Sequence, residues 1–107
     1  MIDKFLAELV GTFVFLSVII TSVHSKSSSI SLAWLKIGLA LSIAILLVGF
    51  ISGGHLNPAV SFMFYLNNQL KLEQLFVYII AQLIGGFFAY LYFKYLNKNY
   101  TCAISAI

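Results

Sequence analysis

The stretch Ser52-Gly53-Gly54-His55-Leu56-Asn57-Pro58-Ala59-Val60-Ser61 decides the fold of this chain. A Gly-Gly pair marks a turn or the end of a helix. Asn57 and Pro58 then favour a new helix, because asparagine is a preferred N-cap residue and proline is preferred at the first helical position. We predict a helix from Pro58 to about Leu66. At 1.5 Å per residue it is about 13 Å long, roughly half the hydrocarbon core of a bilayer.

Three long apolar segments surround this break, over residues 5–23, 30–51 and 72–96. Each has about the 20 residues that a transmembrane helix needs. The composition agrees, with 62% of residues hydrophobic and 8% charged, against about 45–50% and about 25% in soluble domains. The sequence therefore predicts an all-α integral membrane protein with three transmembrane helices in contact with the lipid bilayer.

The same composition excludes several classes of protein. The net charge is +3, but the lysines are scattered, so no basic stripe suited to nucleic acid is present. The single cysteine, Cys102, excludes an internal disulfide. No nucleophile stands beside a base and no metal-ligand cluster occurs, so we expect no enzyme activity, no metal and no cofactor. Because 107 residues allow only three or four membrane crossings, we expect a pore to need a second chain.

Residues 52–66 have two interpretations: a plain loop between two spans, or a re-entrant loop and half-helix that reach the middle of the membrane. Apolar residues after Pro58 favour the second, since irregular backbone at membrane depth occurs only inside protein or along a water-filled cavity. We then expect residues 52–56 to be extended, with the carbonyl groups of Ser52 to His55 forming a ladder of acceptors. The positive end of the half-helix disfavours cations, and the Asn57 amide donates to a neutral oxygen.

Small residues recur at four-residue or similar spacing in each long segment, which lets membrane helices approach closely. We expect these rows to pack the helices into a tight bundle. The rows are Ala7 with Gly11 in the first segment, Gly38, Ser42, Ile45 and Gly49 in the second, and Ala81, Gly85 and Ala89 in the third.

The block Ser52–Ser61 resembles the first Asn-Pro-Ala loop of the major intrinsic protein family, which comprises aquaporins and glycerol facilitators. The flanking segments that are similar to the family's first three helices are Ala7–Thr12, then Gly38–Ala40 with Gly49, and Tyr78–Gln82 with Gly85. The resemblance implies two inverted repeats, each of three spans and one half-helix, of which this chain has the first.

The resemblance also implies roles around the pore. Asn57 donates a hydrogen bond to the substrate, and Pro58 and Ala59 contact the opposing half-helix. The residues whose carbonyl groups line one vestibule are Gly53, Gly54 and His55.

Other positions are implied to support or narrow the pore. Glu8 accepts hydrogen bonds from the loop backbone, with an interfacial charge near the helix start as the alternative. The His55 side chain braces the loop, and Gln82 forms hydrogen bonds near it. Ile37 lies at the outer constriction, where many water-selective members have an aromatic residue. The family's second repeat and its arginine are absent, and the sequence has no arginine, so we expect a less strictly water-selective filter.

Three functional hypotheses remain open. The first is a half-channel whose antiparallel homodimer conducts water or small neutral solutes such as glycerol across the plasma or cell membrane. The weak lysine bias between the two sides suits such dual insertion. The second is a non-conducting remnant, or an accessory subunit that needs a second-repeat partner. The third is a small proton-coupled exporter that uses Glu8 as its carrier.

Overall fold

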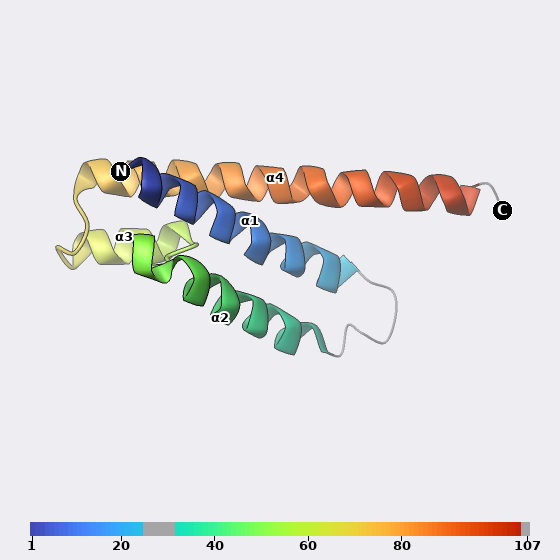
Figure 1. The fold of residues 1–107 in the computed structure, drawn as a ribbon, viewed down its shortest axis with the longest axis horizontal. Helices are drawn as coiled ribbons and strands as arrows, with labels where there is room; N and C mark the ends of the chain where they lie inside the picture. Colours follow the sequence, from blue (N-terminus) through green and yellow to red (C-terminus); the bar gives the residue numbers. More distant parts are fainter. Residues whose placement is uncertain (25–31, 106–107) are drawn as a thin grey trace.

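The computed structural model describes residues 1–24 and 32–105, and these residues form helices and no strands. The four helices are α1 (Ile2–His24), α2 (Ala33–Ser52), α3 (Pro58–Leu66) and α4 (Leu72–Ser105) (Figure 1). The expected serine-rich loop at 25–29 and the first residues of the second span lie outside the described residues, as does the side chain of Cys102. The structure therefore confirms the all-helical fold class.

Three of the helices are long and apolar enough to cross a membrane: Ile2–His24, Ala33–Ser52 and Leu72–Lys98. The short helix α3 occupies the residues for which the sequence predicts it. The end of α4 differs from the expected one, because the helix continues from Leu96 to Ser105. No glycine or proline follows Leu96 within that range, so nothing in the local sequence stops the helix where the apolar run ends.

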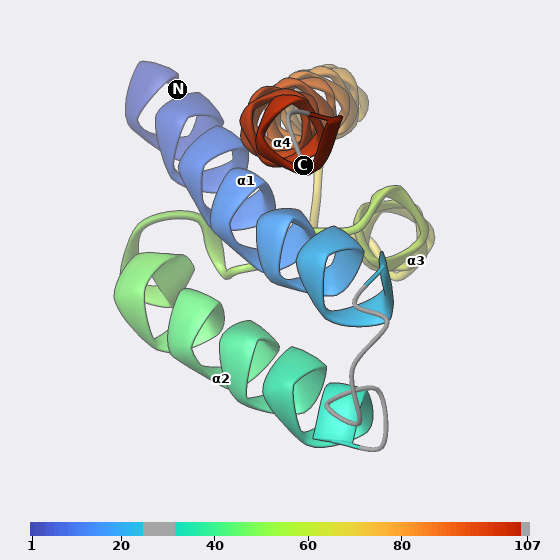
Figure 2. The ribbon, with the colours of Figure 1, turned by 90° about the vertical axis from the view of Figure 1, so that its right-hand side faces the viewer.

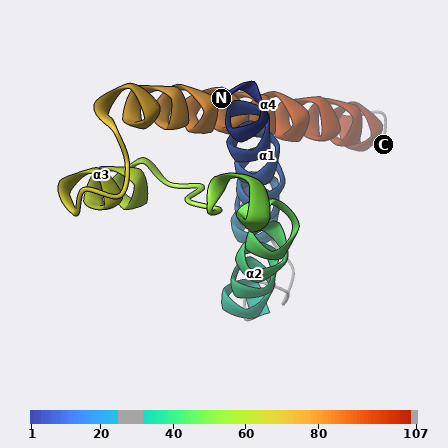
Figure 3. The same cartoon turned by 60° about the vertical axis from the view of Figure 1, so that its left-hand side comes forward.

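The helix α1 lies between α2 and α4 and packs against both, while α3 packs against α4 (Figure 2). The segment that joins α2 to α3 passes behind α1 in the view of Figure 2, and Figure 3 shows it running from the end of α2 to α3. The arrangement brings the middle of the chain onto the first turns of α1. It also leaves much of α2 open, with Leu46 77% and Phe50 85% exposed, as expected for a surface that faces lipid or another protein segment.

The contact between α1 and α4 is made by small residues of α4, as the sequence predicts. Ala81 and Ala89 are buried. Between them, a Cβ atom added to Gly85 would lie 2.6 Å from the Leu9 carbonyl oxygen and 3.1 Å from the Phe13 nitrogen. The two backbones therefore touch at Gly85, and only glycine permits this approach.

The structure corrects the prediction for the small-residue row of α2. Nothing lies within 4 Å of a Cβ added to Gly38, and Ser42 is exposed, with its hydroxyl bonded back to the Gly38 carbonyl at 2.9 Å. The prediction that this row packs the helices of this chain together is therefore wrong for the described residues. The face of α2 that meets α1 is instead set by Ala44 and Val48, which are buried in a core cluster around Gly11 together with Ala7 and Leu56.

Candidate functional site

The site begins where α2 ends, in a sharply turned loop. The Gly53 N–H donates to the Gly49 carbonyl at 2.8 Å, and the φ angles of Gly53 and Gly54 are 89° and 64°. Glycine adopts this left-handed region without steric cost, which explains the Gly-Gly pair. Leu56 also has a positive φ of 55°. The prediction of an extended 52–56 segment is therefore wrong, because Ser52 ends α2 and three further residues have left-handed φ angles.

A single carboxylate holds this loop. Glu8 of α1 is fully buried, and its Oε2 accepts from the Ser52 hydroxyl at 2.6 Å and the His55 N–H at 3.0 Å. Its Oε1 accepts from the Leu56 N–H at 2.8 Å and from Gln82 Nε2 at 2.9 Å. Buried backbone groups need hydrogen-bond partners, and Glu8 supplies them where no helix does. This burial argues against the alternative of an interfacial charge.

A second set of hydrogen bonds ties the loop to α3. Gln82 Nε2 donates to Ser61 Oγ at 2.9 Å, and Ser61 Oγ lies 2.9 Å from His55 Nδ1. The Ser61 hydroxyl thus accepts from Gln82 and shares a hydrogen bond with His55 Nδ1, in which the tautomer of the imidazole decides which group donates. The imidazole also stacks on Phe64, with ring centres 4.7 Å apart, and lies 4.8 Å from the Tyr78 ring.

The carbonyl group of Ser52 is not part of an open ladder. It accepts a hydrogen bond from the buried Tyr78 hydroxyl at 2.6 Å. By contrast, within the part of the chain that the structure describes, no group donates to the carbonyl oxygens of Gly53, Gly54 or His55. The Ser52 carbonyl is therefore not part of the predicted ladder, and the ladder of Gly53, Gly54 and His55 carbonyl groups stays a prediction.

Tyr78→Phe is expected to destabilise the protein by about 1–2 kcal/mol, because the buried Ser52 carbonyl loses its donor while the ring stays against His55. The matched control is Tyr90→Phe, since Tyr90 is 47% exposed. The free energy of unfolding in mixed micelles measures both. An equal and small change in the two variants would contradict the role assigned to the Tyr78 hydroxyl.

The start of α3 presents a side-chain amide. Asn57 is the N-cap of this helix, and its Oδ1 accepts from the Ala59 N–H at 2.8 Å. This bond fixes the side chain so that Nδ2 is the outer atom, and among the described residues none accepts from Nδ2. Asn57, Pro58 and Ala59 are all exposed on this chain. A fixed donor therefore stands beside an apolar surface at the helix start.

The structure brings some predicted residues together and leaves others apart. Glu8, His55 and Gln82 meet in one buried network. Ile37 is partly buried near the start of α2, whereas the loop follows the other end of this helix. Its position is therefore compatible with a separate constriction, which stays a prediction.

Two members of the network were not singled out from the sequence. Ser61 is a small polar residue in the mainly apolar α3, and Tyr78 precedes Gln82 by four residues on α4. Residues four apart share a helix face, so Tyr78 could have been grouped with Gln82. Ser61 could have been noticed because a polar side chain in a short apolar helix needs a partner.

The fold is that of a membrane protein in which the buried carboxylate of Glu8 holds the loop before a half-length helix. The chain belongs to the major intrinsic protein family, whose family model matches residues 1–106. Members of this family are channels and not enzymes, and the chain is a multi-pass integral membrane protein.

Several curated proteins are similar to the chain. It is 36% identical over 86 residues to glycerol uptake facilitator protein-like 6 of Lactiplantibacillus plantarum. This match covers 80% of this chain and 40% of the relative. It is 39% identical over 80 residues to the glycerol uptake facilitator protein of Buchnera aphidicola, covering 75% and 29%. It is 38% identical over 90 residues to aquaporin PIP1-2 of Zea mays, covering 76% and 31%. The chain thus spans less than half the length of these relatives.

Proposed function

We propose that the chain forms half of a channel for passive movement of water or small neutral solutes, such as glycerol, across the plasma or cell membrane. The observation that carries the proposal is the start of α3. There, Asn57 Nδ2 is a fixed free donor, and the carbonyl oxygens of Gly53, Gly54 and His55 have no donor among the described residues. A row of acceptors that ends at a donor suits a molecule that both donates and accepts hydrogen bonds, as water and alcohols do.

The same geometry disfavours cations. The partial positive charge of a helix N-terminus stands at Asn57, where the half-helix begins. A neutral solute crosses this field at little cost, whereas a cation is repelled. The family and its glycerol facilitator relatives support this reading.

A complete pore needs an opposing half-helix. We propose that a second, antiparallel copy supplies it, or a partner that carries the second repeat, with Pro58 and Ala59 at the contact. In an antiparallel pair of this chain the pore contains no arginine, because the sequence has none. The outer filter, with Ile37 near it, is then more apolar and admits polyols as well as water.

The first test separates the two roles of Asn57. Asn57→Asp keeps an oxygen that accepts from the Ala59 N–H but replaces the Nδ2 donor by a carboxylate oxygen. We expect stability to stay near wild type while water flux falls about tenfold, which corresponds to about 1.4 kcal/mol of lost stabilisation. Stopped-flow light scattering on proteoliposomes measures the flux.

The control for this test is Asn97→Asp, which makes the same chemical change near the far end of α4. Unchanged flux in Asn57→Asp, beside a conducting wild type, would remove Asn57 from the pore. If the wild type itself conducts no faster than lipid, the chain is the non-conducting remnant or accessory subunit. A C-terminal tag found on only one side of the membrane would exclude the antiparallel homodimer.

The exporter hypothesis finds less support. A proton carrier has to be reached by protons from both sides in turn, but the Glu8 carboxylate is fully buried and accepts from four donors. Its structural task of holding the loop and the family membership of the chain both favour a channel.

A further inference from the structure

The second half of α4 has an exposed face that the proposed channel does not use. Its members follow one another at intervals of three or four residues, so they lie on one side of the helix. We call this set the lysine face: Leu83, Phe87, Tyr90, Lys94 and Lys98. All five side chains are exposed. The face begins with apolar groups inside the membrane-spanning part of α4 and ends with two cations at the limit of that part.

We propose that the lysine face binds one anionic phospholipid, with its acyl chains along Leu83 and Phe87 and its phosphate group at Lys94 and Lys98. The length of the face supports this occupant. From Leu83 to Lys98 the helix rises about 22 Å, at 1.5 Å per residue. One leaflet, which comprises half of the hydrocarbon core and one headgroup region, is about 20–22 Å thick. A free phosphate ion would use only the two lysines, so a whole lipid is the better match.

The two lysines are available to a negative group. Residues four apart on a helix are neighbours, so both ammonium groups can reach one phosphate. In the part of the chain that the structure describes, the ion pair is that of the N-terminus with Asp3, and no carboxylate pairs with Lys94 or Lys98. The other acidic side chains lie elsewhere, because Glu8 is buried in the loop network and Glu73 is in the first turn of α4. An anionic headgroup would supply the missing counter-charge.

Tyr90 and the end of α1 place these lysines at the depth of the lipid headgroups. Lys94 Nζ lies 5.9 Å from the centre of the Tyr90 ring, within the range of a cation–π contact. Tyrosine is enriched at membrane–water interfaces, because its ring is apolar and its hydroxyl is polar. The last residue of α1, His24, meets Phe93 with ring centres 4.9 Å apart, and Figure 1 shows α4 projecting beyond the end of α1. Lys94 therefore stands where the packed helices end.

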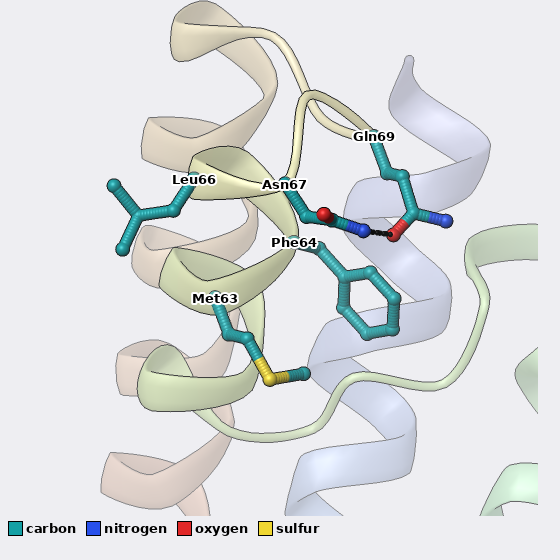
Figure 4. Close-up of a pocket in the computed structure, with 5 residues that line it drawn as sticks. All are labelled: Met63, Phe64, Leu66, Asn67 and Gln69. Carbon is teal, nitrogen blue, oxygen red and sulfur yellow. Dashed lines mark hydrogen bonds between the residues drawn. The ribbon is translucent and has the colours of Figure 1, made fainter.

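The first half of α4 has a different charge pattern. Lys71 is followed by Glu73, so charges of opposite sign stand together there. The neighbouring pocket at the end of α3 is lined by uncharged side chains, and within it Asn67 Nδ2 donates to Gln69 Oε1 at 2.6 Å (Figure 4). An anionic lipid has no pair of cations to bind at this end. The two halves of one helix therefore provide a site and its internal control.

Quenching of tryptophan fluorescence by brominated lipids tests the proposal in the full chain. The sequence has one tryptophan, so Trp34→Phe gives a background without this fluorophore. Phe87→Trp then places a reporter in the lysine face, and Phe76→Trp places the matched reporter in the first half of α4. Both phenylalanines are 57% exposed, and they lie about three helical turns apart on a similar side of the helix.

Each protein is placed in phosphatidylcholine vesicles that contain either phosphatidylglycerol or phosphatidylcholine with brominated acyl chains. At the Phe87→Trp reporter we expect the anionic lipid to associate about 3- to 10-fold more strongly than the zwitterionic lipid, since each surface lysine attracts anionic lipid. At the Phe76→Trp reporter we expect the two lipids to quench equally. Equal quenching at both reporters, or the same preference at both, would overturn the proposal.

Substitutions in the lysine face then test the charges. Lys94→Gln should lower the preference at the Phe87→Trp reporter about 2- to 3-fold, and Lys94→Gln with Lys98→Gln should abolish it. Lys94→Arg with Lys98→Arg should retain it, because the charges stay in place. The matched control is Lys36→Gln, which removes an exposed lysine near the start of α2, at the same end of the helices but outside the lysine face (Figure 1).

Two results of these substitutions would contradict the proposal. One is a preference for the anionic lipid that survives the double change to glutamine. The other is a preference that Lys36→Gln lowers as much as Lys94→Gln does, because the attraction would then come from the general surface charge. Quenching reports contact with lipid and not flux, so the result is independent of whether the chain conducts.

Discussion

Glu8→Gln is expected to cost about 2–5 kcal/mol of stability and to abolish conduction. The carboxylate accepts from four donors, and a glutamine replaces one of its oxygens by an NH₂ group that faces two of them. The Ser52 hydroxyl has an alternative acceptor in the Val48 carbonyl at 3.5 Å, but the His55 and Leu56 N–H groups have none among the described residues. A buried donor left without a partner costs about 1–3 kcal/mol, and the charge-assisted bonds are also lost.

The loss is large against the total stability of a typical domain, about 5–15 kcal/mol. Glu73→Gln is the control, since Glu73 is an exposed residue in the first turn of α4. Two measurements on the purified protein are informative: the free energy of unfolding in mixed micelles, and amide hydrogen exchange at His55 and Leu56. If both amides stay as protected as in wild type, Glu8 does not hold the loop.

Gly85→Ala is expected to separate α1 from α4. The added Cβ meets the Leu9 carbonyl oxygen at 2.6 Å and the Phe13 nitrogen at 3.1 Å, and both are backbone atoms that move only with the whole helix. We expect a loss of about 1–3 kcal/mol from overpacking, although alanine is the better helix former. Because Gln82 lies one turn away, the helix shift also draws its Nε2 away from Glu8.

Gly38→Ala provides the matched comparison. It makes the same substitution in a helix interior, but nothing lies within 4 Å of the new Cβ. We expect it to be neutral or stabilising by up to about 1 kcal/mol, through helix propensity alone. Unfolding of the two variants in parallel gives the answer. Equal stability of Gly85→Ala and Gly38→Ala would show that the α1–α4 contact accommodates a larger side chain than the distances indicate.

The sequence predicts the parts of this fold that depend on local patterns. The apolar runs define the long helices, and Asn57-Pro58 places the start of α3, because helix starts depend on a few neighbouring residues. A carboxylate such as Glu8 in an apolar segment has to find partners, so its place beneath the loop could also be expected.

The remaining features depend on how distant segments meet. The hydroxyls of Ser61 and Tyr78 join the network only because α3 and the loop pack on α4. The left-handed Leu56 is held by a bond to Glu8, 48 residues away, which no local propensity indicates. The small-residue row at Gly38 looks like a packing motif, but the face of α2 that meets α1 carries Ala44 and Val48 instead.

The carboxylate of Glu8 also sets an order of assembly. Its partners are 44, 47, 48 and 74 residues further along the chain. When α1 enters the membrane during synthesis, the acidic side chain precedes all of them, and an acidic group within a membrane-spanning helix is costly until it is paired. The last partner along the chain is Gln82 of α4, whose Nε2 also donates to Ser61 of the short helix. The hydrogen-bond network of Glu8 is therefore complete only after α4 has been inserted, although Glu8 itself is made first.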